Sequence, residues 1–242
     1  SKMDTFNMTK IFFVPKYRQY KNIFPEPVSI QSSIPDWWKK QETYFENNQT
    51  PQGGNMLLTI KKCQAIFDAM TFGYYLKTPM DIYIDSTGDK LIFDIPGAAK
   101  EFQQMLLSNH LKEQISQYPV PEYYHKDIVR IHPMWLIKTE PGYSSLFLSP
   151  IHNNDCILKA IPGVIDTDTY PSDGFLSFFV PKNFKGIIKQ GTPFVQIIPF
   201  KREEWDSSIY NDRNSDFEIA SNQLQVRSVF QNGYRIKKWF KN

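Results

Sequence analysis

The sequence predicts a mainly β fold, a β-rich α+β domain with a small barrel or clip of mostly antiparallel strands, one central helix and a C-terminal helix. Short runs rich in β-branched and aromatic residues recur, and Gly, Pro, Asn and Asp turn signals separate them. Strands at this spacing favour a barrel or sandwich over a parallel α/β sheet. Of 242 residues, 41% are hydrophobic and 15% are aromatic, so the chain can fill a substantial core.

Residues 1–56 are predicted to form a Pro-rich arm that wraps the core. Proline lacks an amide donor and fixes φ, so neither a helix nor a central strand persists where prolines recur. Asp36 is placed to cap a short turn, directly before Trp37 and Trp38. The two tryptophans either anchor the arm to the domain or form a platform on which a ligand stacks. The prolines of this arm are Pro15, Pro25, Pro27, Pro35 and Pro51.

Residues 57–205 are predicted to form the β-rich core domain. Residues 63–70 have the pattern of a short helix, which Gly73 ends. The central helix is predicted at residues 98–117, where apolar side chains recur near helical spacing. The strands are predicted within residues 74–76, 81–85, 90–95, 128–138, 143–148, 163–165, 174–180, 185–188 and 194–200.

Residues 206–242 are predicted to form a C-terminal helix followed by a tail that mixes basic and aromatic side chains. The tail, residues 235–241, either touches phosphates or a membrane surface or packs as an ordinary terminus. A role in binding nucleic acid therefore stays open for this tail.

Charge and cysteine content place the chain among reduced, cytoplasmic proteins. The 28 Lys and Arg exceed the 25 Asp and Glu by only three, so the net charge gives no case for nucleic acid or an anionic membrane. Every apolar run is far shorter than the roughly 20 residues of a spanning helix, so no membrane partner is expected. Cys63 and Cys156 form no metal or disulfide pattern, and no secretory signal precedes the arm.

Two carboxylates suggest where a site lies. Asp166 and Asp168 stand at i and i+2 beside a predicted strand, so both leave the same face and can hold Mg²⁺ or orient a water molecule. The same residue types before Tyr170 also form good turns. After the last strand, Lys201 and Arg202 either bind an anion or form a solvated rim.

Catalytic signatures are sparse in this sequence. There is no phosphate-binding loop, zinc-protease helix or nucleophile elbow, so no cofactor and no confident metal site is predicted. The four histidines are scattered, and none has ligand spacing. His132 precedes Pro133 at a strand, where an imidazole bonded to backbone is the ordinary interpretation and a base or metal ligand is the alternative.

Residues 140–200 resemble the dUTPase and dCTP-deaminase superfamily. The likeness rests on residues 162–166, Pro-Gly-Val-Ile-Asp, and on residues 188–198, with a weaker match at Tyr143. The resemblance implies a β-clip-like core in which Asp166 activates water, Asp168 assists Mg²⁺ and Tyr170 stacks on sugar. The chain departs from that family because Tyr170 stands one residue late, and the phosphate-gripping Arg-Ser-Gly motif and Gly-rich C-terminal arm are absent.

Nearly the whole chain also resembles an uncharacterised family of tailed-phage and bacterial proteins. The resemblance rests on residues 34–39, 59–63, 68–74, 141–144, 163–170 and 191–202. It implies a phage origin, in the host cytoplasm or the virion, and brings no activity with it.

The predicted function is therefore a phage-encoded, non-enzymatic binding or structural protein that contacts a protein partner or a second copy of itself. The candidate ligand-binding side chains are Tyr143, Tyr170, Lys201, Arg202, Trp37 and Trp38, and the candidate catalytic ones are Asp166 and Asp168. The alternative is a dUTPase-like nucleotide-binding protein, or a nucleotide triphosphate pyrophosphatase that uses Mg²⁺.

Overall fold

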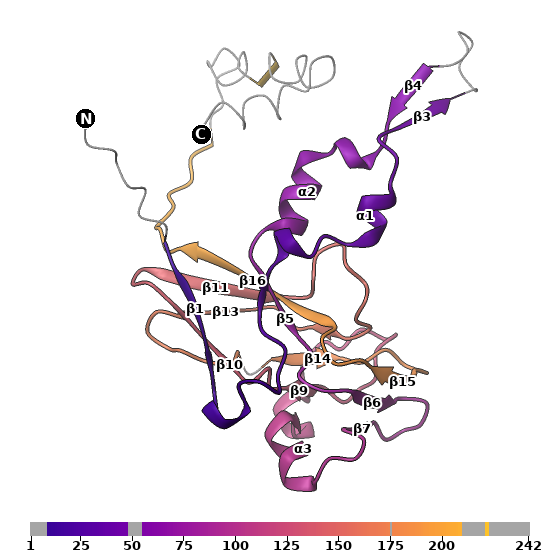
Figure 1. Cartoon of the computed structure of the whole chain (residues 1–242), viewed down its shortest axis with the longest axis vertical. Helices are drawn as coiled ribbons and strands as arrows, with labels where there is room; N and C mark the ends of the chain where they lie inside the picture. The colour runs from indigo at the N-terminus through magenta and orange to yellow at the C-terminus, as the bar shows by residue number, and fades with distance from the viewer. Residues whose placement is uncertain (1–8, 48–54, 175, 210–220, 223–242) are drawn as a thin grey trace. The chain divides into compact units, whose positions relative to one another are not determined.

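The computed structural model describes residues 9–47, 55–174, 176–209 and 221–222 (Figure 1). Most of the segment for which a C-terminal helix and tail are predicted, residues 210–220 and 223–242, lies outside the described residues. The chain divides into two compact units. Unit 1 comprises residues 1–36 and 69–202, and unit 2 comprises residues 37–68 and 203–242.

The predicted mainly β, antiparallel fold is confirmed. The described strands form five sheets, with the orders β1-β10, β13-β11-β16-β5-β2, β12-β14-β9-β8, β15-β6-β7 and β3-β4, and every pairing is antiparallel. None of these described sheets closes on itself, so the predicted barrel is not formed.

The elements have the following bounds. The strands are β1 Ile11–Pro15, β2 Val28–Ser29, β3 Tyr44–Asn47, β4 Asn55–Leu58, β5 Tyr74–Lys77, β6 Ile82–Asp85, β7 Ile92–Asp94, β8 Leu107–Asn109, β9 Val129–Ile131, β10 Trp135–Thr139, β11 Tyr143–Leu148, β12 Lys159–Ala160, β13 Gly163–Ile165, β14 Ser177–Phe179, β15 Lys185–Ile188 and β16 Pro193–Lys201. The α-helices are α1 Asp36–Lys40, α2 Gln64–Thr71 and α3 Lys100–Leu106. The 3-10 helices are η1 Arg18–Tyr20, η2 Ile30–Ser32, η3 Ile60–Lys62 and η4 Lys112–Ile115.

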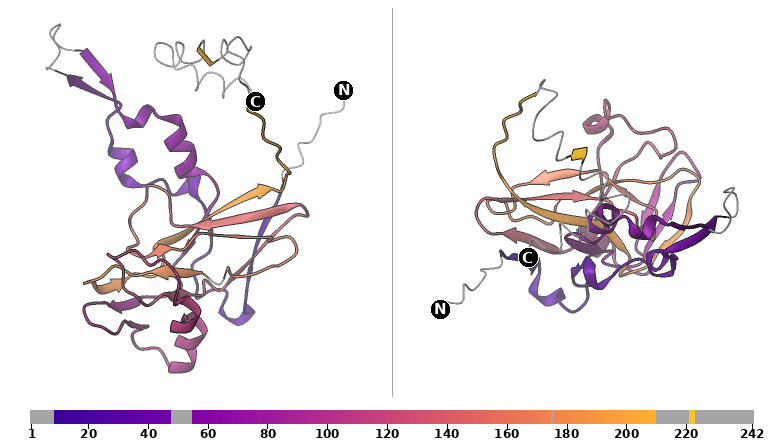
Figure 2. Two further views of the ribbon diagram at one scale, coloured as in Figure 1. Left: turned by 180° about the vertical axis from the view of Figure 1, so that it is seen from behind. Right: turned by 90° about the horizontal axis from the view of Figure 1, so that it is seen from above.

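One hydrophobic core joins the five-stranded and the four-stranded sheets of unit 1. Phe147 of β11 and Ile197 of β16 contribute to it from the first sheet, and Ile131 of β9 from the second. The rings of Phe178 in β14 and Phe194 in β16 stack with centroids 5.2 Å apart. Figure 2 shows β11 (salmon) beside β16 (light orange), the longest strand of this core. Burial of apolar surface between these sheets stabilises unit 1.

A buried glutamine in β16 fastens the C-terminal end of α2 to this sheet. Gln196 is 0% exposed, so its amide must find partners inside the protein. Its Nε2 donates to the carbonyl oxygens of Ala69 and Phe72 at 3.0 and 2.8 Å. Its Oε1 accepts from the N–H of Ile151 at 2.9 Å. The predicted helix at residues 63–70 is confirmed as α2.

The predicted central helix at residues 98–117 is wrong beyond its first two turns. Helix α3 ends at Leu106, and β8 follows immediately because Leu107 to Asn109 pair with β9. Leu107 is 8% exposed and belongs to the core. Apolar residues at near-helical spacing predicted a long helix, but strand pairing with β9 overrides that local preference.

The predicted strand at residues 128–138 is divided into β9 and β10. Between them Pro133 supplies no amide donor, and Met134 has a φ of 63°, which no strand tolerates. The first two strands of the predicted arm pair only at sheet edges: β1 with β10, and β2 at the end of the five-stranded sheet. The same segment also contains α1 and β3, so it is not extended throughout.

Across the residues that the structure describes, each helix is too short or too polar to cross a bilayer.

Gly73, which follows α2, is expected to be intolerant of any side chain. Its φ is +90°, and a Cβ there would lie 2.0 Å from the carbonyl oxygen of Ile197. Gly97 has a φ of +79° with no heavy atom within 4 Å of such a Cβ. We expect Gly97→Ala to lower the free energy of unfolding by about 1 to 2 kcal/mol, and Gly73→Ala by about 1 to 3 kcal/mol more. Urea unfolding of both variants measures the difference, and equal losses would contradict the steric argument.

Candidate functional site

The two predicted carboxylates lie in a turn that directly follows β13. The N–H groups of Thr169 and Tyr170 both donate to the carbonyl oxygen of Asp166, at 3.1 and 2.8 Å. The predicted turn is therefore confirmed at this position. Asp168 lies within it, so the backbone of one short turn carries both carboxylates.

A buried threonine between the carboxylates orients the turn. Thr167 is 0% exposed. Its Oγ1 lies 2.8 Å from Oγ1 of Thr139 in β10 and 3.0 Å from Oγ of Ser145 in β11. This hydroxyl network holds Thr167 inside, whereas Asp166 and Asp168 on either side of it both reach the guanidinium of Arg202.

Arg202, directly after β16, bridges the two carboxylates. Its Nη1 and Nη2 lie 2.9 and 2.5 Å from Oδ1 and Oδ2 of Asp168, in a two-pronged contact. Nη1 is also 3.3 Å from Oδ1 of Asp166. The same nitrogen donates to the carbonyl oxygen of Tyr143 and to Oγ of Ser144, each at 3.0 Å. We call Arg202, Asp168 and the Gly142 backbone the carboxylate clasp.

Asp168 is the inner member of this clasp. Its side chain is only 5% exposed, and Oδ2 accepts the N–H of Gly142 at 2.7 Å. The Arg202 guanidinium, with help from this N–H, holds the pKa of the Asp168 carboxyl well below its usual range although burial opposes this. Asp168 is therefore ionised at physiological pH, and it joins the start of β11, the turn after β13 and the end of β16.

The carboxylates do not fit a magnesium ion. Mg²⁺ requires several oxygen ligands in near-octahedral geometry. Both oxygens of Asp168 already accept N–H donors from Arg202 and Gly142, and the guanidinium cation stands 3.3 Å from Asp166. A second cation between these carboxylates would be repelled by Arg202. We therefore derive no chemistry through this metal.

Asp166 is the outer, accessible carboxylate. Its side chain is 56% exposed, and Oδ1 accepts the Oγ–H of Ser144 at 2.5 Å. Ser144 itself is 1% exposed, so the hydroxyl is fixed by the fold. An exposed carboxylate held in this way can accept a hydrogen bond or a proton from a molecule in solvent.

Of the other predicted site residues in unit 1, Arg202 contacts the carboxylates directly, and Tyr143 is linked to them only through Arg202. The hydroxyl of Tyr143 lies 3.3 Å from Oγ1 of Thr9, and its carbonyl oxygen accepts from Arg202. Tyr170 belongs to the same turn and is 57% exposed. Lys201 is exposed and pairs with Tyr143 across β11 and β16.

The two predicted tryptophans belong to α1 and have different surroundings. Trp38 is 6% exposed, and its ring lies 5.5 Å from that of Phe67 in α2. Trp37 is 39% exposed and meets Trp38 edge-on at 5.4 Å. Trp38 is therefore a packing residue between α1 and α2, and Trp37 is the more exposed of the two.

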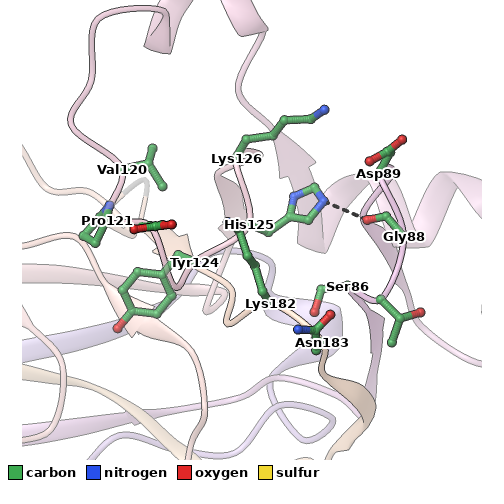
Figure 3. Close-up of a pocket in the computed structure, with 12 residues that line it drawn as sticks. Ser86, Gly88, Asp89, Val120, Pro121, Tyr124, His125, Lys126, Lys182 and Asn183 are labelled. Carbon is green, nitrogen blue, oxygen red and sulfur yellow. Dashed lines mark hydrogen bonds between the residues drawn. The ribbon is translucent and has the colours of Figure 1, made fainter.

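A separate cleft of about 630 Å³ lies elsewhere in unit 1 (Figure 3). Asp127 N–H donates to Nδ1 of His125, so the other ring nitrogen, Nε2, carries the proton that binds the Gly88 carbonyl oxygen at 3.3 Å. Burial, and then its neighbour Tyr123, raises the pKa of the Tyr124 hydroxyl in this cleft to about 12. The charged residues of the cleft balance in sign, so they favour no ligand charge; they are Asp89, Glu122, Lys126 and Lys182.

Sequence reasoning missed Ser144, Gly142 and Thr167 as parts of the carboxylate site. Ser144 and Gly142 are 22 and 26 residues from the carboxylates that they bind. The signal that was present is the run Tyr143-Ser144-Ser145, because small hydroxyl residues in an otherwise apolar strand often bond to a neighbouring segment.

No protein-family model matches this chain, and a search among curated proteins returned no match either.

The clasp predicts that the two carboxylates differ in their contribution to stability. Asp168→Asn removes the charge that Arg202 grips, so we expect a clear loss of unfolding free energy at neutral pH. Asp166→Asn, at the exposed position, should lower the unfolding free energy several times less than Asp168→Asn does. Urea unfolding of both variants compares them directly.

The pH dependence of the same variants has a defined sign. The folded pKa of Asp168 is depressed, so its contribution is present above the unfolded carboxyl pKa of about 3.9 and lost as pH falls toward the folded value. The difference between the wild type and Asp168→Asn should therefore shrink below about pH 4. A difference that stays constant with pH would contradict the clasp.

Proposed function

We propose that this chain is a structural interaction protein that self-associates through the hairpin of β3 and β4. The single observation that supports this function is that the hairpin presents large apolar side chains to solvent on both of its faces. The resemblance to a tailed-phage family supports a place in the host cytoplasm or the virion, and the free Cys63 and Cys156 fit a reducing compartment.

The hairpin's apolar residues alternate between its two faces. Tyr44 pairs with Leu58 on one face, and Phe45 pairs with Leu57 on the other. Their exposed fractions are 47%, 50%, 48% and 39%. A monomeric protein rarely presents such side chains together unless they meet a partner.

The base of the hairpin is held firmly, so this exposure belongs to a folded element. Thr59 donates its N–H to the carbonyl oxygen of Thr43 at 3.1 Å and its hydroxyl to the carbonyl oxygen of Glu42. Close by, Lys61 Nζ donates to the carbonyl oxygen of Lys39 at 2.9 Å. These bonds fix the point from which β3 and β4 extend.

A second copy of the chain fits this hairpin as a partner. Two strands with no further neighbour among the described residues leave two edges of unpaired backbone groups, and such ribbons are marginal by themselves. The same ribbon in a second copy presents complementary edges and matching apolar faces, as a two-fold contact requires.

Sedimentation velocity over a wide concentration range tests the proposal. The wild type should associate reversibly, and Phe45→Thr with Leu57→Thr should weaken association about 100-fold, since each buried apolar side chain contributes roughly 1.5 to 3 kcal/mol. Threonine preserves strand propensity.

The matched control is Ile187→Thr, another exposed apolar residue (47%) on an edge strand, β15. It should leave association unchanged. A wild type that stays monomeric at every concentration, or an equal effect of the control, would overturn self-association through this hairpin.

A nucleotide-binding function is the second candidate. It is favoured by the exposed Asp166 carboxylate, with Arg202 beside it and Tyr170 exposed in the same turn. Titration calorimetry with deoxynucleoside triphosphates should then show binding that Asp166→Asn weakens at least about tenfold, as for loss of a charge-assisted hydrogen bond. Absence of heat from a folded sample would reject this candidate.

A further inference from the structure

The four-stranded sheet of unit 1 carries a row of polar side chains on the face opposite the core. Ser108 of β8 and Ser177 of β14 both stand directly opposite Arg130 of β9, so the three share one face. The residues between them turn the other way, and Val129 and Phe178 are 0% exposed. The strand alternation therefore separates an apolar inner face from a half-buried polar outer face.

A serine, a histidine and an aspartate meet at one end of this outer face. Oγ of Ser108 lies 3.5 Å from Nε2 of His132. Nδ1 of the same imidazole lies 3.1 Å from Oδ2 of Asp173, whose side chain is 2% exposed. The order hydroxyl, imidazole and carboxylate is that of a nucleophile, a base and a group that orients the base. A distance of this length between the serine and the histidine is common before substrate binds.

The carboxylate determines which ring nitrogen of His132 carries the proton. Burial raises the pKa of the Asp173 carboxyl, but hydrogen bonds from His132 and Lys16 outweigh it and hold the pKa at about 2. An ionised carboxylate only accepts hydrogen bonds, so Nδ1 of His132 must be the donor. The lone pair of Nε2 then faces the hydroxyl of Ser108, as a general base requires.

The fold fixes each member of this group. The N–H of His132 donates to the carbonyl oxygen of Leu106 at 2.8 Å, directly after β9. Asp173 follows Ser172, whose carbonyl oxygen accepts the N–H of Ile137 in β10 at 2.9 Å. Strand β8 holds Ser108 in register with β9. Ser108 is therefore held within a strand, His132 directly after one, and Asp173 next to the isolated bridge of Ser172 with Ile137.

We propose that Ser108, His132 and Asp173 form a hydrolytic centre for small carboxylic esters. Ser108 is the nucleophile, His132 the general base and acid, and Asp173 the residue that positions His132. This centre goes beyond the interaction function and uses none of the hairpin residues.

The reaction divides into two balanced halves. In the first, Oγ of Ser108 bonds to the ester carbonyl carbon while its proton passes to Nε2 of His132. The bond from that carbon to the alkoxy oxygen then breaks, and His132 returns the proton to the leaving alcohol. In the second, water loses a proton to His132 and attacks the acyl-serine, which releases the carboxylic acid and restores the Ser108 hydroxyl.

The surrounding charges favour this centre over the neighbouring Ser177. Ser177 Oγ lies 2.8 Å from Nε2 of His110, but Nδ1 of that ring lies 2.7 Å from Nη2 of Arg130. Burial, and then the charge of Arg130, lowers the pKa of His110, which disfavours the imidazolium that a general base becomes. His132 instead faces a carboxylate, and Arg130 on the same face can stabilise negative charge that develops on the substrate.

The test treats the full chain with a fluorophosphonate probe at mildly alkaline pH and locates the adduct by peptide mass mapping. We expect one phosphonylated residue, Ser108, and no adduct in Ser108→Ala. Ser177→Ala is the matched control on the same sheet face and should be labelled at the wild-type rate. p-Nitrophenyl acetate should be hydrolysed with a burst that Ser108→Ala abolishes. Circular dichroism verifies that both variants fold.

A separate readout tests the positioning role of Asp173. The ¹⁵N chemical shifts of His132 report which ring nitrogen is protonated, and Asp173→Asn should move that proton away from Nδ1 and slow labelling by at least about tenfold. Three results would overturn the proposed centre: a folded wild type that is not labelled, an adduct that persists in Ser108→Ala, or an adduct that disappears in Ser177→Ala. Labelling is measured independently of sedimentation, so failure of the hydrolytic proposal can be told apart from failure of the self-association proposal.

Discussion

The antiparallel pairing of β11 with β16 is the contact on which both the core and the carboxylate clasp of unit 1 depend. The register sets Tyr143 opposite Lys201, which brings the backbone N–H of Arg202 within 2.9 Å of the Gly142 carbonyl oxygen. The inner face of the same pair contributes Phe147 to the core. A shift of the β11–β16 register by one residue would expose Phe147 and also move Arg202 away from Asp168. Apolar burial and the ion pair therefore favour the same register.

The clasp also shows that two carboxylates on one face do not by themselves define a metal or acid–base site. Their chemistry depends on the nearest cation. The guanidinium of Arg202 binds both oxygens of the buried Asp168 and so links the end of β16 to the turn after β13. Removal of either partner would leave the other charge uncompensated. Asp166 has more than half of its side chain in solvent, so a molecule in solution can reach it. One turn thus contains a structural carboxylate and an accessible one.

Local patterns predicted most strands of unit 1, because alternation and turn residues act over a few positions. Strands β5, β6, β11 and β16 lie where they were expected. The spacing of Asp166 and Asp168 predicted that both belong to one site, but a turn after β13 and the side chain of Arg202 bring them together rather than the alternation of a strand. The partners of these carboxylates did not follow from spacing, since Ser144 and Gly142 reach them only through strand pairing, which no local pattern encodes.

The mistaken helix at residues 98–117 shows how an error in secondary structure hides chemistry. On a helix, Ser108 and His110 would point about 200° apart, at about 100° per residue, and would share no site. In the structure Ser108 lies in β8 and His110 follows that strand directly, so both face Arg130 of β9 and the neighbouring His132. Pairing with β9 gives this segment its strand conformation, and Leu107 is buried in the core at the same time. The strand that buries Leu107 in the core therefore also places Ser108 on the polar outer face, opposite Arg130.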